Sequence, residues 1–160
     1  MNRDENILTR VNDVVAIDGP VLERAQQIAE IIREACGHRW VGIYRVTGSE
    51  IAAIAWTGTH APAYLRFPAD RGLSGAAVRS RATVVVKDVT QDPRYLTAFD
   101  STRAEMIVPV LDPGSGRAVG AIDVESEHIN AFTDEDRTLL EKCARLLVPL
   151  FVEGSGPAAA

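Results

Sequence analysis

Apolar residues recur every three or four positions in two segments of the chain, which is the spacing of an amphipathic helix. Over residues 21–36 the apolar positions on one face are Val21, Ala25, Ile28, Ile32 and Ala35. From Thr133 onward they are Leu139, Leu140, Cys143, Leu146, Leu147 and Leu150. We predict a helix in each segment, and a weaker one over residues 3–15.

The residues that flank these segments indicate where the helices begin and end. We expect Asp18 to cap the helix over residues 21–36, Pro20 to suit its first turn and Gly37 to end it. The acidic residues 134–136 are favourable near the positive N-terminal end of the last helix.

Runs rich in β-branched and aromatic residues lie between the two helical segments, and they predict five strands: 40–46, 51–57, 83–86, 105–111 and 118–125. A short helix is expected over residues 73–79, and turn residues at 47–50 and 112–116 favour hairpins. This order of elements predicts an α+β fold. We expect one antiparallel sheet, with helices packed on one face and loops covering a ligand pocket on the other.

Composition narrows the class of protein. The 160 residues suit one domain, 1–152, followed by a flexible tail over 153–160. No apolar run approaches the ~20 residues of a membrane-spanning helix, and a net charge of −5 argues against a nucleic-acid partner. Cys36 and Cys143 lack the spacing of a disulfide framework, and the N-terminus lacks a secretory signal, which together predict a cytoplasmic protein.

Alternation along the predicted strands places candidate chemistry on one face of the sheet. Asp123 and Glu125 share a face of one strand, Trp40 and Tyr44 share a face of another, and Glu105 opens a third. If these faces coincide, they form a site with three carboxylates and two aromatic rings. The alternative is that the acidic residues belong to a solvated face of the sheet and that the aromatic residues belong to the core.

The segment Gly72-Leu73-Ser74-Gly75-Ala76 approaches the G-x-S-x-G elbow of serine hydrolases, but Ala76 stands where the elbow needs glycine. The elbow also follows a strand, whereas the preceding residues lack a strand pattern. We therefore do not expect Ser74 to be a nucleophile. The remaining interpretations are a helix cap, or a ligand contact beside the free N–H groups at a helix start.

Five blocks of the sequence resemble, in order and spacing, those of the GAF domain family: WVGIYRV, GLSGAAV, AEMIVPV, GAIDVES and FTDEDRTLLEKCARLL. The resemblance covers a core of about residues 21–151 and is greatest to the free methionine-(R)-sulfoxide reductases within that family. It implies that the pocket aromatics and the substrate-side carboxylates are Trp40, Tyr44, Glu105, Asp123 and Glu125, the last being Asp in the family.

The sequence departs from these reductases at their cysteines. Ser74 stands in place of the cysteine in the glycine turn, and Phe99, followed by Asp100, stands in place of the cysteine before Asp-Ser. Sulfoxide reduction needs a thiolate that attacks sulfur and a second cysteine that resolves the sulfenic acid as a disulfide. A serine hydroxyl can do neither. The alternative is a divergent reductase that draws its thiol from Cys36 or from an external reductant.

We therefore expect a stand-alone sensory or regulatory module, without catalysis of its own, that binds a small molecule. Acidic pocket groups favour a ligand with an ammonium group, such as an amino acid or a related polar metabolite, and Ser74, Phe99 and Asp100 are expected to contact it. No cofactor and no metal is expected, because Cys36 and His38 lack a second pair of metal ligands. The wide leucine stripe of the last helix predicts a homodimer through the terminal helices. A separate output protein would receive the signal.

Overall fold

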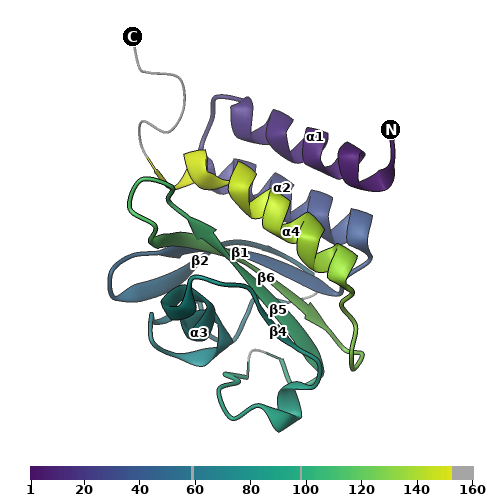
Figure 1. Cartoon of the computed structure of the whole chain (residues 1–160), viewed down its shortest axis with the longest axis vertical. Helices are drawn as coiled ribbons and strands as arrows, with labels where there is room; N and C mark the ends of the chain where they lie inside the picture. The colour runs from purple at the N-terminus through teal and green to yellow at the C-terminus, as the bar shows by residue number, and fades with distance from the viewer. Residues whose placement is uncertain (59, 98, 153–160) are drawn as a thin grey trace.

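The computed structural model describes residues 1–58, 60–97 and 99–152, and within them three helices lie on one side of an antiparallel sheet and a fourth lies on the other (Figure 1). The helices are α1 (Arg3–Ala16), α2 (Val21–Cys36), α3 (Gly72–Ser80) and α4 (Asp134–Leu146), with short 3₁₀ helices η1 (Val89–Gln91) and η2 (Val148–Leu150). The strands are β1 (Trp40–Val46), β2 (Glu50–Thr57), β3 (Arg66–Pro68), β4 (Val84–Val86), β5 (Ala104–Leu111) and β6 (Ala118–Ser126). The predicted α+β fold is confirmed, while the predicted tail over 153–160 lies outside the described residues.

The strands are ordered β3-β2-β1-β6-β5-β4, and every neighbouring pair is antiparallel. Strand β3 was not predicted from the sequence. It has only three residues and ends in Pro68, so it is too short to show an alternating pattern, and it forms because Phe67 pairs with Ile51 of β2. The central pair β1 and β6 sets the geometry of the site, since Trp40 lies opposite Glu125 and Gly42 opposite Asp123.

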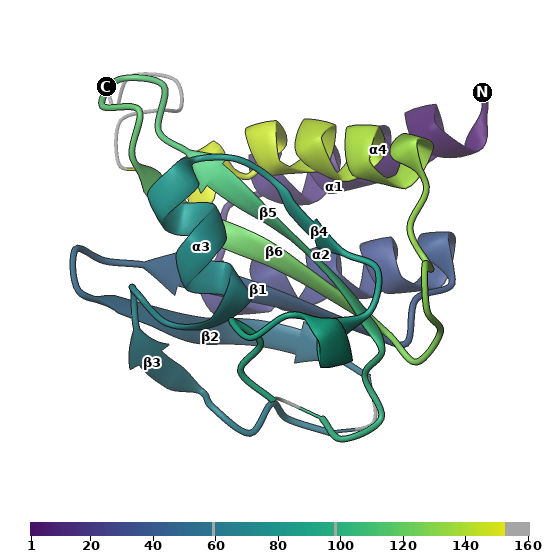
Figure 2. The same cartoon turned by 60° about the horizontal axis from the view of Figure 1, so that its bottom comes forward.

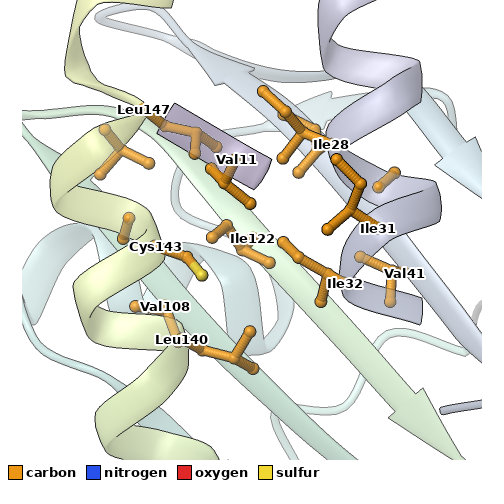
Figure 3. Packing of buried hydrophobic residues seen from close by; sticks show 14 of the residues in the cluster. Val11, Ile28, Ile31, Ile32, Val41, Val108, Ile122, Leu140, Cys143 and Leu147 are labelled. Carbon is orange, nitrogen blue, oxygen red and sulfur yellow. The ribbon is translucent and has the colours of Figure 1, made fainter. Parts of the chain in front are cut away.

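The main core lies between the sheet and helices α1, α2 and α4 (Figure 3). Val41 and Ile122 point from the sheet toward Ile28 and Ile32 of α2, and all four are fully buried. A second apolar cluster lies on the opposite face, where α3 and the loops cover the sheet (Figure 2). Among the described residues, no helix combines the length and the apolar character needed to cross a membrane.

Local hydrogen bonds explain where the helices begin. Both α1 and α4 start with a capping box: the Asn2 side chain accepts from the N–H of Glu5 at 2.8 Å, and the Thr133 hydroxyl accepts from the N–H of Asp136 at 3.1 Å. The predicted Asp18 cap of α2 is wrong. Pro20 occupies the cap position there and no side chain caps this helix.

Candidate ligand-binding site

Three carboxylic acids meet on the face of the sheet that α3 covers. Glu105 of β5 lies directly opposite Glu125 of β6, and Asp123 lies two residues earlier on β6, on the same face. One oxygen from each side chain lies within 4.8 Å of the others, a spacing that could also hold a divalent cation. All three residues are buried, with 6%, 4% and 1% exposure for Glu105, Asp123 and Glu125 respectively. These residues, which we call the carboxyl trio, therefore do not form a solvated face.

Burial dominates the electrostatics of the carboxyl trio. Loss of water raises the pKa of Glu105 and of Glu125 well above the ordinary range, and the neighbouring carboxyl groups raise both further. Burial also raises the pKa of Asp123, to about 7, although a hydrogen bond with Glu105 acts in the opposite direction. A hydrogen bond between two carboxyl groups requires a proton, so the trio holds protons that exposed carboxylates would have lost at neutral pH.

Several oxygen atoms of the carboxyl trio lack hydrogen-bond partners within the described part of the chain. They are Oδ1 of Asp123 and both carboxyl oxygens of Glu125. The Thr102 hydroxyl and the Arg39 guanidinium lie near enough to oppose the rise in the pKa of Glu125, but neither makes a hydrogen bond of good geometry with it. Buried polar atoms without partners are costly, and in native proteins they usually receive a donor.

Aromatic side chains form the wall beside the carboxyl trio. The ring centroid of Trp40 lies 5.4 Å from that of Phe99 and 6.5 Å from that of Tyr44, and Tyr44 lies 6.1 Å from Phe67. Trp40 also donates from Nε1 to the carbonyl oxygen of His60 at 3.2 Å, which fixes its indole. Burial, followed by the charge of Asp123, raises the pKa of Tyr44 well above its usual value, so its phenol stays neutral.

A small cavity of about 30 Å³ lies between this wall and α3. The sequence-predicted residues that line it are Tyr44, Ser74, Glu105 and Asp123. It is also lined by Pro62, Tyr64, Phe67, Gly72, Leu73 and Leu96. Its volume is that of about one water molecule. The site is therefore nearly closed, and a larger ligand requires the covering segments to move.

The glycine turn places Ser74 against this cavity. Gly72 begins α3 with φ of +70°, which favours glycine, and Gly75 lets the helix approach the Asp70 backbone closely. The interpretation of Ser74 as a helix cap is wrong, because α3 has no side-chain cap and its cap position is Arg71. Ser74 is instead buried, with 5% exposure, and faces the cavity shared with Glu105.

A second segment covers the site from the side of β1. The Arg39 side chain donates to the Ser101 hydroxyl, and its guanidinium carbon lies 5.6 Å from the centroid of the Phe99 ring. Phe99 is thereby held against Trp40, and neither of these two residues lines the cavity. Asp100 is exposed and does not line the cavity, so its predicted contact with a ligand stays a prediction.

Both cysteines lie away from this site. Cys36 and Cys143 belong to the main core on the opposite face of the sheet. Burial raises the pKa of the Cys36 thiol to about 11 and that of Cys143 to about 12. Neither thiol is placed to attack a molecule held by the carboxyl trio, which removes the structural basis for Cys36 as an internal nucleophile.

Sequence reasoning missed part of the cavity wall. Tyr64, Phe67 and Leu96 lie in segments that were predicted to be irregular, and the loop residue Ser101 was not connected with Arg39. The aromatic residues at positions 64 and 67, placed between prolines, were the only available signal. Contacts between distant loops leave no periodic pattern in the sequence, so these residues of the cavity wall could be identified only from the structure.

Comparisons with known proteins find that the chain is similar to GAF domain proteins and to free methionine-R-sulfoxide reductases. The sequence profile of the GAF domain family matches residues 20–148. The chain is 25% identical over 144 residues to GAF domain-containing protein A of Dictyostelium discoideum, covering 89% of each chain. It is 28% identical over 111 residues to the free methionine-R-sulfoxide reductase of Saccharomyces cerevisiae, covering 68% of this chain and 60% of that protein.

A solved structure is similar over most of the chain. It is the X-ray structure of free methionine-R-sulfoxide reductase from Neisseria meningitidis in complex with its substrate. The two sequences are 31% identical, the match covers 92% of this chain and 87% of the other, and the TM-score is 0.83.

Proposed function

Because the chain belongs to the GAF domain family, we propose that it is a small-molecule-binding module whose ligand presents an ammonium group to the carboxyl trio. The observation that carries this proposal is the set of unpartnered buried oxygens on Asp123 and Glu125. An ammonium group brings three N–H donors and a positive charge. Hydrogen bonds between an ammonium and carboxylates are short and strong, and they would offset the desolvation of the trio.

The aromatic wall supports an amino acid as the ligand class. Trp40 and Phe99 offer apolar and π surfaces to a side chain, while the carboxyl trio receives the amino group. Free methionine-(R)-sulfoxide is the first compound to test, because a similar reductase was solved with its substrate bound. The cavity of about 30 Å³ is too small for any amino acid, so binding requires the segments carrying Tyr64 and Leu96 to shift.

The experiment compares two ligands that differ only in the amino group. Titration calorimetry at pH 8 with methionine-(R)-sulfoxide and with its N-acetyl derivative should give binding for the first ligand alone. Glu125→Gln should weaken that binding, whereas Glu127→Gln, an exposed neighbour beyond the end of β6, should not. Equal affinity for the acetylated compound would refute the ammonium proposal.

The pH dependence gives an independent readout of the same site. Binding a cation requires the carboxyl trio to lose protons that it holds at neutral pH, since the pKa of Asp123 is about 7. Affinity should therefore increase as the pH rises through this region, with proton release visible as a difference in heat between two buffers. Affinity that is constant from pH 6 to pH 8 would contradict this linkage.

A second candidate function is reduction of the sulfoxide, which the similarity to the reductases favours. The reaction converts a sulfoxide and two thiols into a thioether, a disulfide and water. Ser74 supplies no thiol, and the pKa of Cys36 is raised to about 11 in the opposite layer. We expect no turnover with a dithiol reductant. Turnover that disappears in Cys36→Ala would establish the enzyme instead.

A further inference from the structure

A groove lies along helix α4, beside the outer edge of the sheet. Its volume is about 560 Å³. Strand β4 pairs only with the first half of β5, Glu105–Ile107, so the half from Val108 to Leu111 has no neighbouring strand on its outer side among the described residues. The apolar residues that line the groove, which we call its floor, are Ala82, Val108, Pro109, Leu111, Pro113, Ala144 and Val148.

The rim of this groove is positively charged although the chain carries a net charge of −5. Arg81, Arg137 and Arg145 line it, together with one acidic residue, Glu141. Burial acts to raise the pKa of Glu141, but hydrogen bonds from Arg137 at 2.8 Å and from the Thr83 hydroxyl at 2.9 Å hold it below the ordinary value. The Glu141 carboxylate is thus already bound by partners on the rim.

Two arginines on the rim remain available for an anion. Within the described part of the chain, neither Arg81 nor Arg145 takes part in an ion pair, and both are exposed. A guanidinium group presents planar pairs of N–H donors that match a carboxylate. Arg145 lies near enough to Glu141 for its charge to lower the pKa of that carboxyl group, but it forms no ion pair with it. The combination of an apolar floor with guanidinium groups outside ion pairs is complementary to a molecule with an apolar body and one negative end.

We propose that this groove binds a small amphipathic carboxylate, with its apolar body on Val108, Leu111 and Val148 and its carboxylate between Arg81 and Arg145. The volume lies within the range of small-molecule sites. An added peptide strand is less suited to this edge, because Pro109 has no N–H and proline interrupts strand pairing. The groove shares no lining residue with the cavity at the carboxyl trio, so the two sites are tested separately.

The test is an amide-detected NMR titration with octanoate, using neutral octanamide of equal length as the control ligand. Octanoate should give saturable shifts in the amide signals of Val108, Leu111 and Ala144, and octanamide should give much smaller ones. Arg145→Gln should weaken octanoate binding about tenfold, as expected for loss of a charged hydrogen bond. Arg10→Gln, an exposed arginine of α1 outside the groove, should leave the affinity unchanged.

Three outcomes would overturn the proposal. Equal shifts with octanamide would mean that the rim charges do not select the ligand. Octanoate affinity unchanged in both Arg145→Gln and Arg81→Gln would remove the proposed carboxylate contact, and using both variants guards against loss of folding in either. A change of molecular mass in Arg145→Gln, measured by light scattering without ligand, would assign the groove to contact between two copies of the chain.

Discussion

At the scale of single residues, burial decides the chemistry of Glu105, Asp123 and Glu125. An exposed aspartate is ionised at neutral pH, but here the surrounding side chains exclude water and the three groups lie within 4.8 Å of one another. The trio therefore keeps protons, and its charge depends on whether a cation is present. Under the proposed function this makes it suited to detect an ammonium group, and it makes the folded protein less stable at high pH.

The raised pKa of Asp123 predicts that the protein becomes less stable as the pH increases. The folded pKa of about 7 lies above the ordinary aspartate pKa of 3.8, so the folded state holds a proton between these limits that the unfolded chain has released. The titration of Asp123 alone should lower the free energy of unfolding by up to about 1.4 kcal/mol per pH unit across this window. Urea denaturation at pH 5, 6, 7 and 8 measures this slope.

Asp123→Asn should reduce that dependence, because an amide does not titrate, while the raised pKa values of Glu105 and Glu125 preserve the remainder. The control is Asp18→Asn, an exposed aspartate between α1 and α2 that caps neither helix. The control should retain the slope of the unchanged protein. An identical slope in Asp123→Asn would mean that the proton resides elsewhere in the trio or is not held at all.

The two thiols, one partly and one fully buried, give a second prediction at this scale. With its pKa raised from 9.0 to about 11, Cys36 should hold about 100-fold less thiolate at pH 7.5 than an unperturbed cysteine. Its alkylation by iodoacetamide should be slower by a similar factor in the folded protein, and urea should restore the ordinary rate. The variant Cys143→Ala isolates the signal of Cys36. Rapid alkylation of the folded variant would make Cys36 a candidate nucleophile again.

At the scale of elements, the spacing of apolar residues predicted the long helices and strands. It did not predict segments whose structure depends on contacts with residues distant in sequence. The helices over 21–36 and after Thr133 and the two long strands β5 and β6 carry strong apolar patterns, and the structure confirms them. Strand alternation also placed Asp123 and Glu125 on one face. Strand β3 and the cavity wall around Tyr64 could not be predicted, because pairing with β2 and packing against α3 depend on residues distant in sequence.

The close approach of α3 to the preceding backbone makes Gly75 sensitive to substitution. A Cβ atom at this position would lie 2.7 Å from the Asp70 carbonyl carbon and 3.1 Å from the Ala69 carbonyl oxygen, and both are backbone atoms that cannot rotate away. Alanine normally stabilises a helix interior by up to about 1 kcal/mol relative to glycine. Here we expect the steric clash to outweigh that gain, with a net decrease of about 1–3 kcal/mol in the free energy of unfolding.

The measurement for Gly75→Ala is the denaturant midpoint, with Gly48→Ala as the matched control. Gly48 lies in the turn between β1 and β2, and a Cβ atom there would meet nothing within 4 Å. The control should change the midpoint little. A higher midpoint in Gly75→Ala would show that α3 can move away from Asp70, and that the turn tolerates a side chain.

At the scale of the whole molecule, the sheet divides the protein into two layers with different tasks. The layer of α1, α2 and α4 contains most of the buried aliphatic side chains, and the layer of α3 contains the carboxyl trio and the aromatic wall. The leucine stripe of α4 is used within the chain, since Leu139, Leu140, Cys143 and Leu147 are at most 1% exposed. Its width reflects packing against the sheet and α1, so it no longer motivates a homodimer.

The homodimer stays a prediction, and exposed apolar side chains at the corner between α1 and α2 now motivate it. Ile17 and Leu22 are 57% and 58% exposed there. Burying such side chains between two copies would stabilise a dimer through the predicted terminal helices. Light scattering after gel filtration should give twice the chain mass of 17.3 kDa at micromolar concentration.

The variant Ile17→Asp with Leu22→Asp should dissociate this dimer, because each protomer would bring like charges into the contact. Ile129→Asp is the control, since Ile129 is 60% exposed but lies after β6, away from the helical corner. It should remain dimeric. A mass of 17.3 kDa for the unchanged protein at every concentration would refute the dimer. Loss of the dimer in Ile129→Asp alone would instead place the interface beside the loop that follows β6.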